Sequence, residues 1–122
     1  MALKPMVMEF GTGADIRGQD YTKAAVRALQ NALRHNSISI ADALGMERTD
    51  MRVKILIGVA KPQEVDTSAV AAVLPYGQAE VEVVEGGLDT PLESGEGLVV
   101  MANAGLTVYL DMDDAHTERG AS

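Results

Sequence analysis

The arrangement of this chain is decided by residues 11–20, Gly-Thr-Gly-Ala-Asp-Ile-Arg-Gly-Gln-Asp, which join an apolar run to a helical pattern. The run from Met6 to Phe10 predicts a first strand. Asp20 is a predicted helix N-cap, because its carboxylate reaches the free N–H groups of the first turn. An alanine-rich face able to lie close on a sheet then predicts a helix to about His35: Ala24, Ala25, Ala28, Leu29, Ala32 and Leu33.

The middle of the chain alternates between strand and helix patterns. Residues 39–44, followed by Gly45, predict a short helical connector. Residues 51–60 predict the best strand, with odd-numbered residues on a core face and the other face apolar only from Leu56. Asp66 is a predicted N-cap of a two-turn helix that ends at residues 75–77. Residues 79–85 predict a strand with one face in water.

The C-terminal third predicts a loop, a hairpin and a tail. Residues 88–97 are acidic and glycine-containing, which predicts a flexible loop. Residues 98–102 and 106–112 flank Asn103-Ala104-Gly105, which predicts a three-residue hairpin connection. We expect one domain over residues 1–112 and a disordered tail over residues 113–122.

The resulting order is β-α-β-α-β-β, or β-α-β-α-β-β-β, depending on how the strand before the hairpin is counted. Two crossover helices and a terminal hairpin predict an α+β fold, a two-layer sandwich in which a mixed β-sheet carries its helices on one face. This order resembles that of the Bacillus chorismate mutase-like folds, whose subunits form rings with sites at subunit boundaries. The resemblance is one of topology and carries no residues across.

The composition predicts an aliphatic core and self-association. Apolar residues make up 47% of the chain but aromatic residues only 3%. A core of small aliphatic side chains buries little area per residue. A subunit of this kind therefore gains stability when it buries further surface against copies of itself. We therefore expect a homo-oligomer, in the form of a closed ring.

Charge and cysteine content exclude several function classes. The net charge of −8, without a Lys/Arg cluster, disfavours nucleic acid and anionic membranes as partners. The absence of cysteine excludes disulfides, thiol catalysis and thiolate metal sites. No segment reads as a signal peptide or a membrane span, so we expect a cytoplasmic protein.

The glycine-rich segment is the candidate site. A glycine turn between a strand and a helix can present N–H groups and a positive helix end to an anion. The third glycine, however, lies five residues after the second, which is not the dinucleotide spacing, and we expect no nucleotide cofactor. Asp15 is a candidate catalytic base, or a ligand for a cation. The candidate binding residues are Gly11, Gly13, Arg17, Gly18, Asp20, Thr22 and Lys23.

Other polar residues have simpler explanations. His35 lies at the end of the predicted helix, where the helix C-terminus favours a charged capping side chain. Two separated histidines, His35 and His116, do not form a zinc-ligand pattern, and we expect no metal. Glu85 belongs to the solvent-facing side of its predicted strand.

The pattern Gly11-x-Gly13-x-Asp15-x-Arg17-Gly18, with His35-Asn36-Ser37 after it, resembles the Lin family of conserved hypothetical proteins found in bacteria and plants. The mark of that family is an N-terminal Gly-x-Gly-x-Asp-x-His-Gly motif, and this chain has Arg17 at the histidine position. Arginine stays protonated and has no lone pair to donate, so the exchange favours anion binding over proton transfer there.

Two hypotheses follow. In the first, the chain binds or converts a small anionic metabolite held by Arg17 and Lys23, with Asp15 as base or orienting group, in a cleft that a neighbouring subunit completes. In the second, it is a homo-oligomeric structural or interaction protein without catalytic activity, and the glycine segment packs against a neighbour. The residues do not decide whether the chain is an enzyme.

Overall fold

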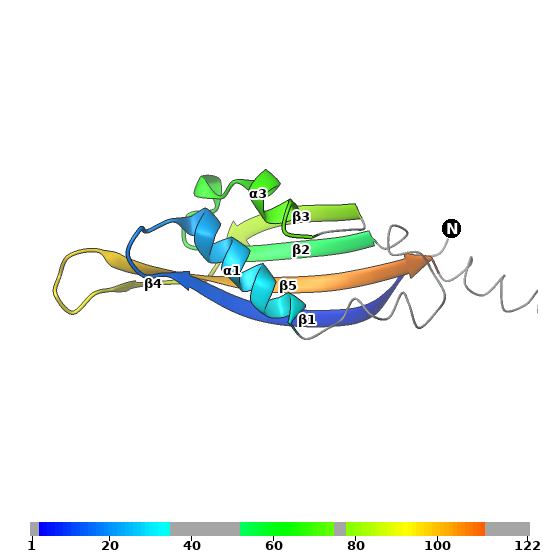
Figure 1. The fold of residues 1–122 in the computed structure, drawn as a ribbon, viewed down its shortest axis with the longest axis horizontal. Coiled ribbons are helices and arrows are strands. Elements are labelled where there is room, and N and C mark those ends of the chain that lie inside the picture. The colour runs from blue at the N-terminus through cyan, green and yellow to red at the C-terminus, as the bar shows by residue number, and fades with distance from the viewer. Residues whose placement is uncertain (1–2, 35–51, 75–77, 112–122) are drawn as a thin grey trace, which may run out of the picture.

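A computed structural model describes residues 3–34, 52–74 and 78–111, and Figure 1 shows one open sheet of five strands with two α-helices within these residues. The predicted α+β class with a mixed sheet is confirmed. In chain order the elements are β1 (Leu3–Asp15), α1 (Tyr21–Leu33), β2 (Arg52–Val59), the 3-10 turn η3 (Pro62–Glu64), α3 (Thr67–Ala71), β3 (Gln78–Glu85), β4 (Leu88–Pro91) and β5 (Leu98–Asp111).

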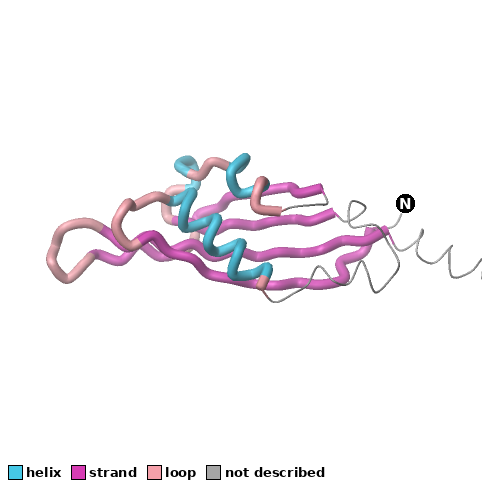
Figure 2. Tube along the Cα trace, viewed as in Figure 1, coloured by secondary structure: helices cyan, strands magenta, loops and turns pink. Residues whose placement is uncertain are grey.

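The sheet is ordered β1-β5-β2-β3, and β4 also pairs with β5 (Figure 2). Strand β5 is antiparallel to β1, β2 and β4, whereas β2 and β3 are parallel. The last strand of the chain is therefore placed between β1 and β2, so the core depends on pairings between residues that are distant in sequence.

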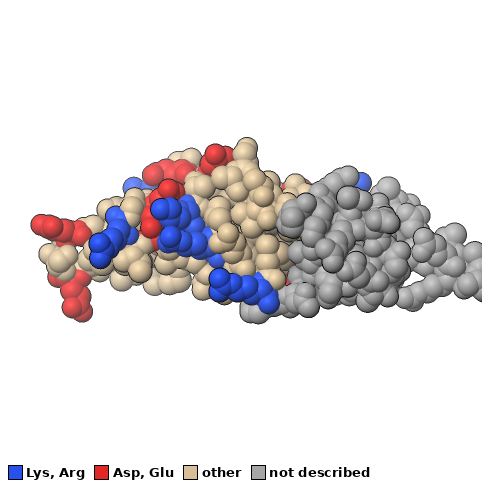
Figure 3. All heavy atoms as spheres, in the orientation of Figure 1, with Lys and Arg blue, Asp and Glu red and all other residues tan. Residues whose placement is uncertain are grey.

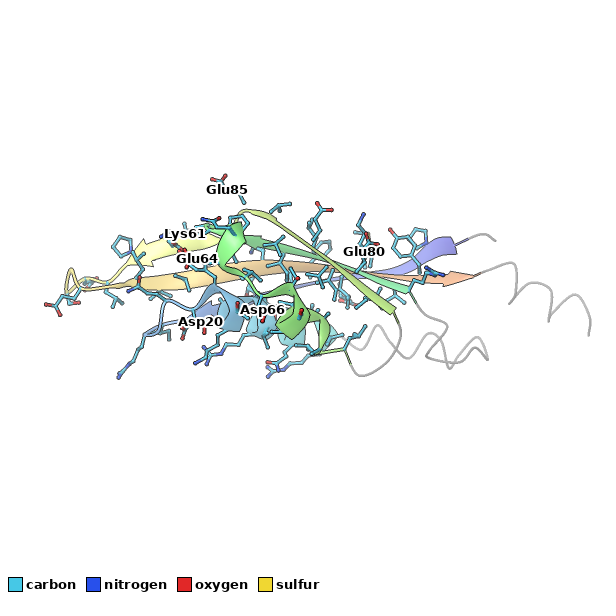
Figure 4. The ribbon with its side chains drawn as sticks, turned by 90° about the horizontal axis from the view of Figure 1, so that it is seen from above. Asp20, Lys61, Glu64, Asp66, Glu80 and Glu85 are labelled. Carbon is cyan, nitrogen blue, oxygen red and sulfur yellow. The ribbon has the colours of Figure 1, made fainter. Side chains whose placement is uncertain are left out.

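The helices form one layer and the sheet the other. Alternate residues of β2 and β5 are buried on the face that α1 and α3 cover, and Figure 4 shows both helices on the same side of the sheet. No described element covers the opposite face, which confirms the expected two-layer arrangement. The fully buried side chains that join the two layers include Leu29, Val70, Ile55, Ile57, Val100 and Leu106.

Glycines 11 and 13 lie in β1, and the prediction of a turn at these positions is wrong. Gly11 pairs with Ala104 and Gly13 with Ala102, and α1 packs directly on both. A Cβ at Gly13 would lie 2.3 Å from the nitrogen of Ala28, and one at Gly11 would lie 2.4 Å from the oxygen of the same residue. The glycines are needed because the helix backbone approaches the strand too closely for a side chain.

Residues 98–111 form one continuous strand, so the predicted hairpin around Asn103 is wrong. Asn103 pairs with Thr12 of β1 on one side and with Gly58 of β2 on the other. Pairing on both sides keeps the backbone extended where the local sequence favours a turn. The Asn103 Oδ1 atom accepts a hydrogen bond from the N–H of Gly87, at 3.1 Å, and so holds the connection from β3 to β4.

The predicted loop over residues 88–97 begins with strand β4, which pairs Leu88 with Met101 and Pro91 with Leu98. The observed order is β-α-β-α-β-β-β, one of the two expected orders, but its last two strands, β4 and β5, form an antiparallel hairpin around residues 92–97 and not around Asn103. The resemblance to the order of the chorismate mutase-like folds stays a prediction.

The remaining local predictions agree with the structure where the structure describes them. Asp20 and Asp66 cap α1 and α3 through side-chain hydrogen bonds, and β2 buries its odd-numbered residues from Val53 to Val59. Helix α3, at five residues, is shorter than expected. The predicted connector over 39–44, the turn over 75–77, the tail over 113–122 and both histidines lie outside the described residues.

Candidate functional site

The carboxylate of Asp15 shapes the turn between β1 and α1. Asp15 is 5% exposed, and its Oδ2 atom accepts a hydrogen bond from the N–H of Asp20 at 2.9 Å. Its Oδ1 atom lies 3.6 Å from Nη1 of Arg27. A Cβ at Gly18 would lie 2.7 Å from Asp15 Oδ2, so glycine lets the turn close over the carboxylate. These contacts give Asp15 a structural role in the turn, and the guanidinium of Arg27 offsets its negative charge.

The first turn of α1 is held by side chains on both sides. Asp20 Oδ1 accepts a hydrogen bond from the N–H of Lys23 at 3.0 Å. Thr22 Oγ1 accepts from the N–H of Asp66 at 2.9 Å and donates to the carbonyl of Glu64 at 3.3 Å. Thr22 therefore connects α1 to the segment that contains η3 and α3. Figure 4 labels Asp20, Glu64 and Asp66 in this region.

Buried Tyr21 and half-buried Asp89 form a hydrogen-bonded pair that sequence reasoning missed. The Tyr21 hydroxyl donates a hydrogen bond to Asp89 Oδ2, joining the start of α1 to β4 across 68 residues of sequence. This hydrogen bond, the burial of the ring and the negative charges of Asp89 and Glu64 raise the pKa of Tyr21 to about 12. No local pattern marks such a pair, because it exists only once β4 pairs with β5.

The other oxygen of Asp89, Oδ1, is buried and accepts no hydrogen bond from any described residue. A buried carboxylate oxygen without a donor is costly, which makes this position sensitive to substitution. No group of three or more His, Asp or Glu side chains within residues 3–34, 52–74 and 78–111 is arranged to hold a metal ion.

Basic side chains gather around the start of α1. Arg17 and Lys23 are exposed and form no ion pair within the described part of the chain. In Figure 3 the Lys and Arg side chains lie mainly along α1 and the turn before it. This surface can attract an anionic partner, although the net charge of the whole chain is −8.

The predicted site residues therefore divide into two groups. Gly11 and Gly13 lie beneath α1 and pair with β5. Asp15, Gly18, Asp20 and Thr22 build the turn and the first helical residues. Arg17 and Lys23 are the basic side chains of this set, and neither forms an ion pair with the described residues.

The face of the sheet that no described element covers, called the uncovered face below, carries large apolar side chains. The exposed fractions are 64% for Phe10, 59% for Met8 and 43% for Leu56. Phe10 and Leu56 are both register partners of Gly105, so they flank one position of β5. Val84 and Leu88 extend the same face onto β3 and β4. The sequence signal for this surface was the change of the outer face of β2 to apolar at Leu56.

No helix in the described residues is long and apolar enough to cross a membrane. A search of curated proteins finds no match. A crystal structure of an FtsZ-like protein of unknown function from Nostoc punctiforme is similar to this chain, with 31% sequence identity and a TM-score of 0.79. The similarity covers 91% of this chain and 98% of that one.

The expected membership in a family of conserved hypothetical proteins is confirmed by a family model that covers most of the chain. That model describes a conserved hypothetical protein (Lin0512_fam) and matches residues 5–108. The chain belongs to this family.

Proposed function

We propose that this protein is a homo-oligomeric assembly protein whose subunits pack through the uncovered face of the sheet. The observation that carries the proposal is the group of large apolar side chains on that face, Met8, Phe10, Leu56, Val84 and Leu88. We call this group the open-face patch.

The arrangement of the open-face patch supports an interface. Single exposed apolar side chains are common on monomers, whereas a contiguous group marks an interaction surface. Phe10 and Leu56 adjoin through Gly105, and Leu88 pairs with Met101 on the same strand β5. The low aromatic content of the core gives a further reason for association, because a second copy adds buried area that the single subunit lacks.

The test compares oligomeric mass in wild-type protein and in the double variant Phe10→Ser/Leu56→Ser, by sedimentation velocity over a range of concentrations. Ile16→Ser is the matched control, because Ile16 is 59% exposed but lies in the turn before α1. We expect an oligomer for the wild type and for the control, and a smaller species for the double variant. A monomeric wild type, or a double variant of unchanged mass, would contradict the proposal.

A second candidate function, the binding of a small anionic metabolite beside the α1 N-terminus, is favoured by one observation. The negative charge of Asp15 is offset by Arg27, and Arg17 and Lys23 are exposed close to it in sequence. In this candidate Arg17 and Lys23 hold the anion, and Asp15 orients the turn that carries them. The similar structure is described as FtsZ-like and of unknown function, so its description adds no ligand.

Thermal unfolding in the presence of inorganic phosphate or citrate tests the second candidate. A ligand at ~100 times its dissociation constant adds about 2.7 kcal/mol of apparent stability. The variant Arg17→Gln/Lys23→Gln should lose this stabilisation, whereas Arg34→Gln, a charge removed from the other end of α1, should keep it. No stabilisation of the wild type by any small carboxylate or phosphate would exclude this function.

A further inference from the structure

Strand β3 forms one edge of the sheet. It stands last in the strand order β1-β5-β2-β3, and β2 is the one described strand that pairs with it. The pairing keeps one register from Arg52 and Gln78 to Val59 and Glu85, without a bulge or a proline in β3. Figure 1 shows β3 along this edge, and Figure 4 looks down onto it. A regular edge strand of eight residues is a template for one more strand.

The hydrogen bonds to β2 show which backbone groups of β3 are unpaired. The N–H of Gly86 donates to the carbonyl of Val59 at 2.9 Å. Alternate residues of a strand direct their backbone groups to the same side, so residues 80, 82 and 84 also face β2. The N–H and C=O groups of residues 79, 81, 83 and 85 therefore point away from the sheet, and no described residue forms a backbone hydrogen bond with them.

Apolar side chains of β3 lie on the face that the helices cover. Ala79, Val81 and Val83 pack against the core but are only partly buried. The core therefore ends at β3 with apolar surface that the described residues leave incompletely covered. A strand added at this edge would continue the sheet and cover that surface with apolar side chains of its own.

The alternate residues of β3 carry negative charge. Glu80 and Glu82 lie on the uncovered face, next to Leu56 and Val84 of the open-face patch. Both glutamates are exposed and form no ion pair with the described residues. On the side of β2 the register partner of Glu80 is a basic residue, Lys54. A strand on the outer side with basic residues on this face would place opposite charges beside both glutamates.

We infer that the edge of β3 binds an extended segment of a partner protein in which Lys or Arg alternates with Val, Ile or Leu. The segment adds one strand to the sheet through the unpaired backbone groups of residues 79, 81, 83 and 85, and its basic side chains lie beside Glu80 and Glu82.

Complementary charge selects this partner over a second copy of the chain. An antiparallel pair of β3 strands would bring the glutamates of two copies together on one face, where like charges repel. The net charge of −8 on each copy adds to that repulsion. The contact therefore goes beyond the proposed function and does not require self-association.

The test measures the binding of a labelled peptide with blocked ends, Lys-Val-Lys-Ile-Lys-Val-Lys, by fluorescence anisotropy. We expect saturable binding to the wild-type protein that weakens at high salt. The acidic peptide Glu-Val-Glu-Ile-Glu-Val-Glu, and a basic peptide of the same composition with its lysines consecutive, should bind about tenfold more weakly or worse, since neither combines basic charge with alternation. No binding of the first peptide, or equal binding of all three, would overturn the inference.

Amide hydrogen exchange followed by NMR locates the bound peptide. In the free protein the amides of residues 81 and 83 should exchange faster than those of residues 82 and 84, which face β2. The peptide should slow exchange at residues 81 and 83 and leave residues 82 and 84 nearly unchanged. Binding without this alternating protection would place the peptide elsewhere and contradict strand addition.

The variant Val81→Pro removes one outward N–H without removing a hydrogen bond to β2, and its ring blocks the edge. It should bind the peptide about tenfold more weakly, whereas the matched control Val81→Thr, which keeps the N–H and a β-branched side chain, should bind like the wild type. Glu80→Gln/Glu82→Gln should weaken binding severalfold and reduce its salt dependence, and it tests the site if the proline variant does not fold. Unchanged binding by either folded variant would refute the contact.

Sedimentation velocity of the same variants separates this contact from the open-face interface. Val81→Pro should keep the wild-type mass and lose the peptide, whereas Phe10→Ser/Leu56→Ser should change the mass and keep the peptide. A folded proline variant of smaller mass than the wild type would show that a second copy occupies the edge, and would overturn the inference. A monomeric wild type that binds the peptide would contradict the proposed function alone.

Discussion

Replacing Gly13 by alanine should separate α1 from the sheet. The new Cβ would lie 2.3 Å from the nitrogen of Ala28 and 2.6 Å from the carbonyl oxygen of Ala24, whereas ordinary contacts begin at 3.4 Å. Because both neighbours are helix backbone, no side-chain rotation relieves the overlap. The helix must retreat by ~1 Å, the difference between these distances, and a gap of that size forfeits up to about half of each contact well.

The expected cost is about 3 kcal/mol, at the upper end of the usual range for overpacking. Helix α1 buries Ala24, Ala28 and Leu29 completely, so a retreat disturbs the centre of the core and not its rim. For a domain of 122 residues this cost corresponds to a fall of roughly 10 °C in the melting temperature.

Urea and thermal unfolding measure the effect, with Gly105→Ala as the matched control. A Cβ at Gly105 would lie 3.8 Å from the Phe10 ring on the uncovered face, an ordinary contact. The control should change the free energy of unfolding by less than about 1 kcal/mol. Both variants are compared at equal protein concentrations, because self-association adds to apparent stability. Equal stabilities of Gly13→Ala and Gly105→Ala would refute the close-packing explanation.

Three further predictions concern the start of α1. Asp15→Asn should lower the free energy of unfolding by about 1–2 kcal/mol in urea, because the hydrogen bond from the N–H of Asp20 and the pairing with Arg27 weaken; stability equal to wild type would contradict this role. Asp20→Ala should cost about 1 kcal/mol in the same assay, and Asp20→Asn almost nothing, since asparagine also caps; equal losses would argue against capping. The raised pKa of Tyr21, about 12, means that the native state holds this proton more tightly than the unfolded state, so stability present below pH 10 should be lost between pH 10 and pH 12. An ultraviolet titration should show a phenol ionising near 12 that Tyr21→Phe lacks, and an unchanged titration would contradict the hydrogen-bonded pair with Asp89.

Local sequence predicted the elements that carry their own signals. The alanine spacing after Asp20 predicted α1 and its buried face, and Asp66 predicted the start of α3. Regular alternation predicted the core face of β2. These features need only neighbouring residues, because caps and periodic apolar faces depend on contacts within one or two turns or along one strand.

The sequence singled out residues 11–20 as a candidate site, but it did not predict how these residues pack. The segment was correctly singled out as unusual, and its glycines were assigned to a turn because glycine is common in turns. The actual cause, the close approach of α1 to Gly11 and Gly13, depends on a packing distance that no local pattern contains. The burial of Asp15 against Arg27 likewise depends on that packing.

The sequence by itself determined the α+β class, the helix caps and the apolar faces of α1 and β2. The tertiary structure decided which strand lies in the middle. Asn103-Ala104-Gly105 has the residues of a turn, yet pairing with β1 on one side and β2 on the other keeps it extended. The sequence did not predict that placement, because strand order arises from long-range pairing and not from the preferences of neighbouring residues.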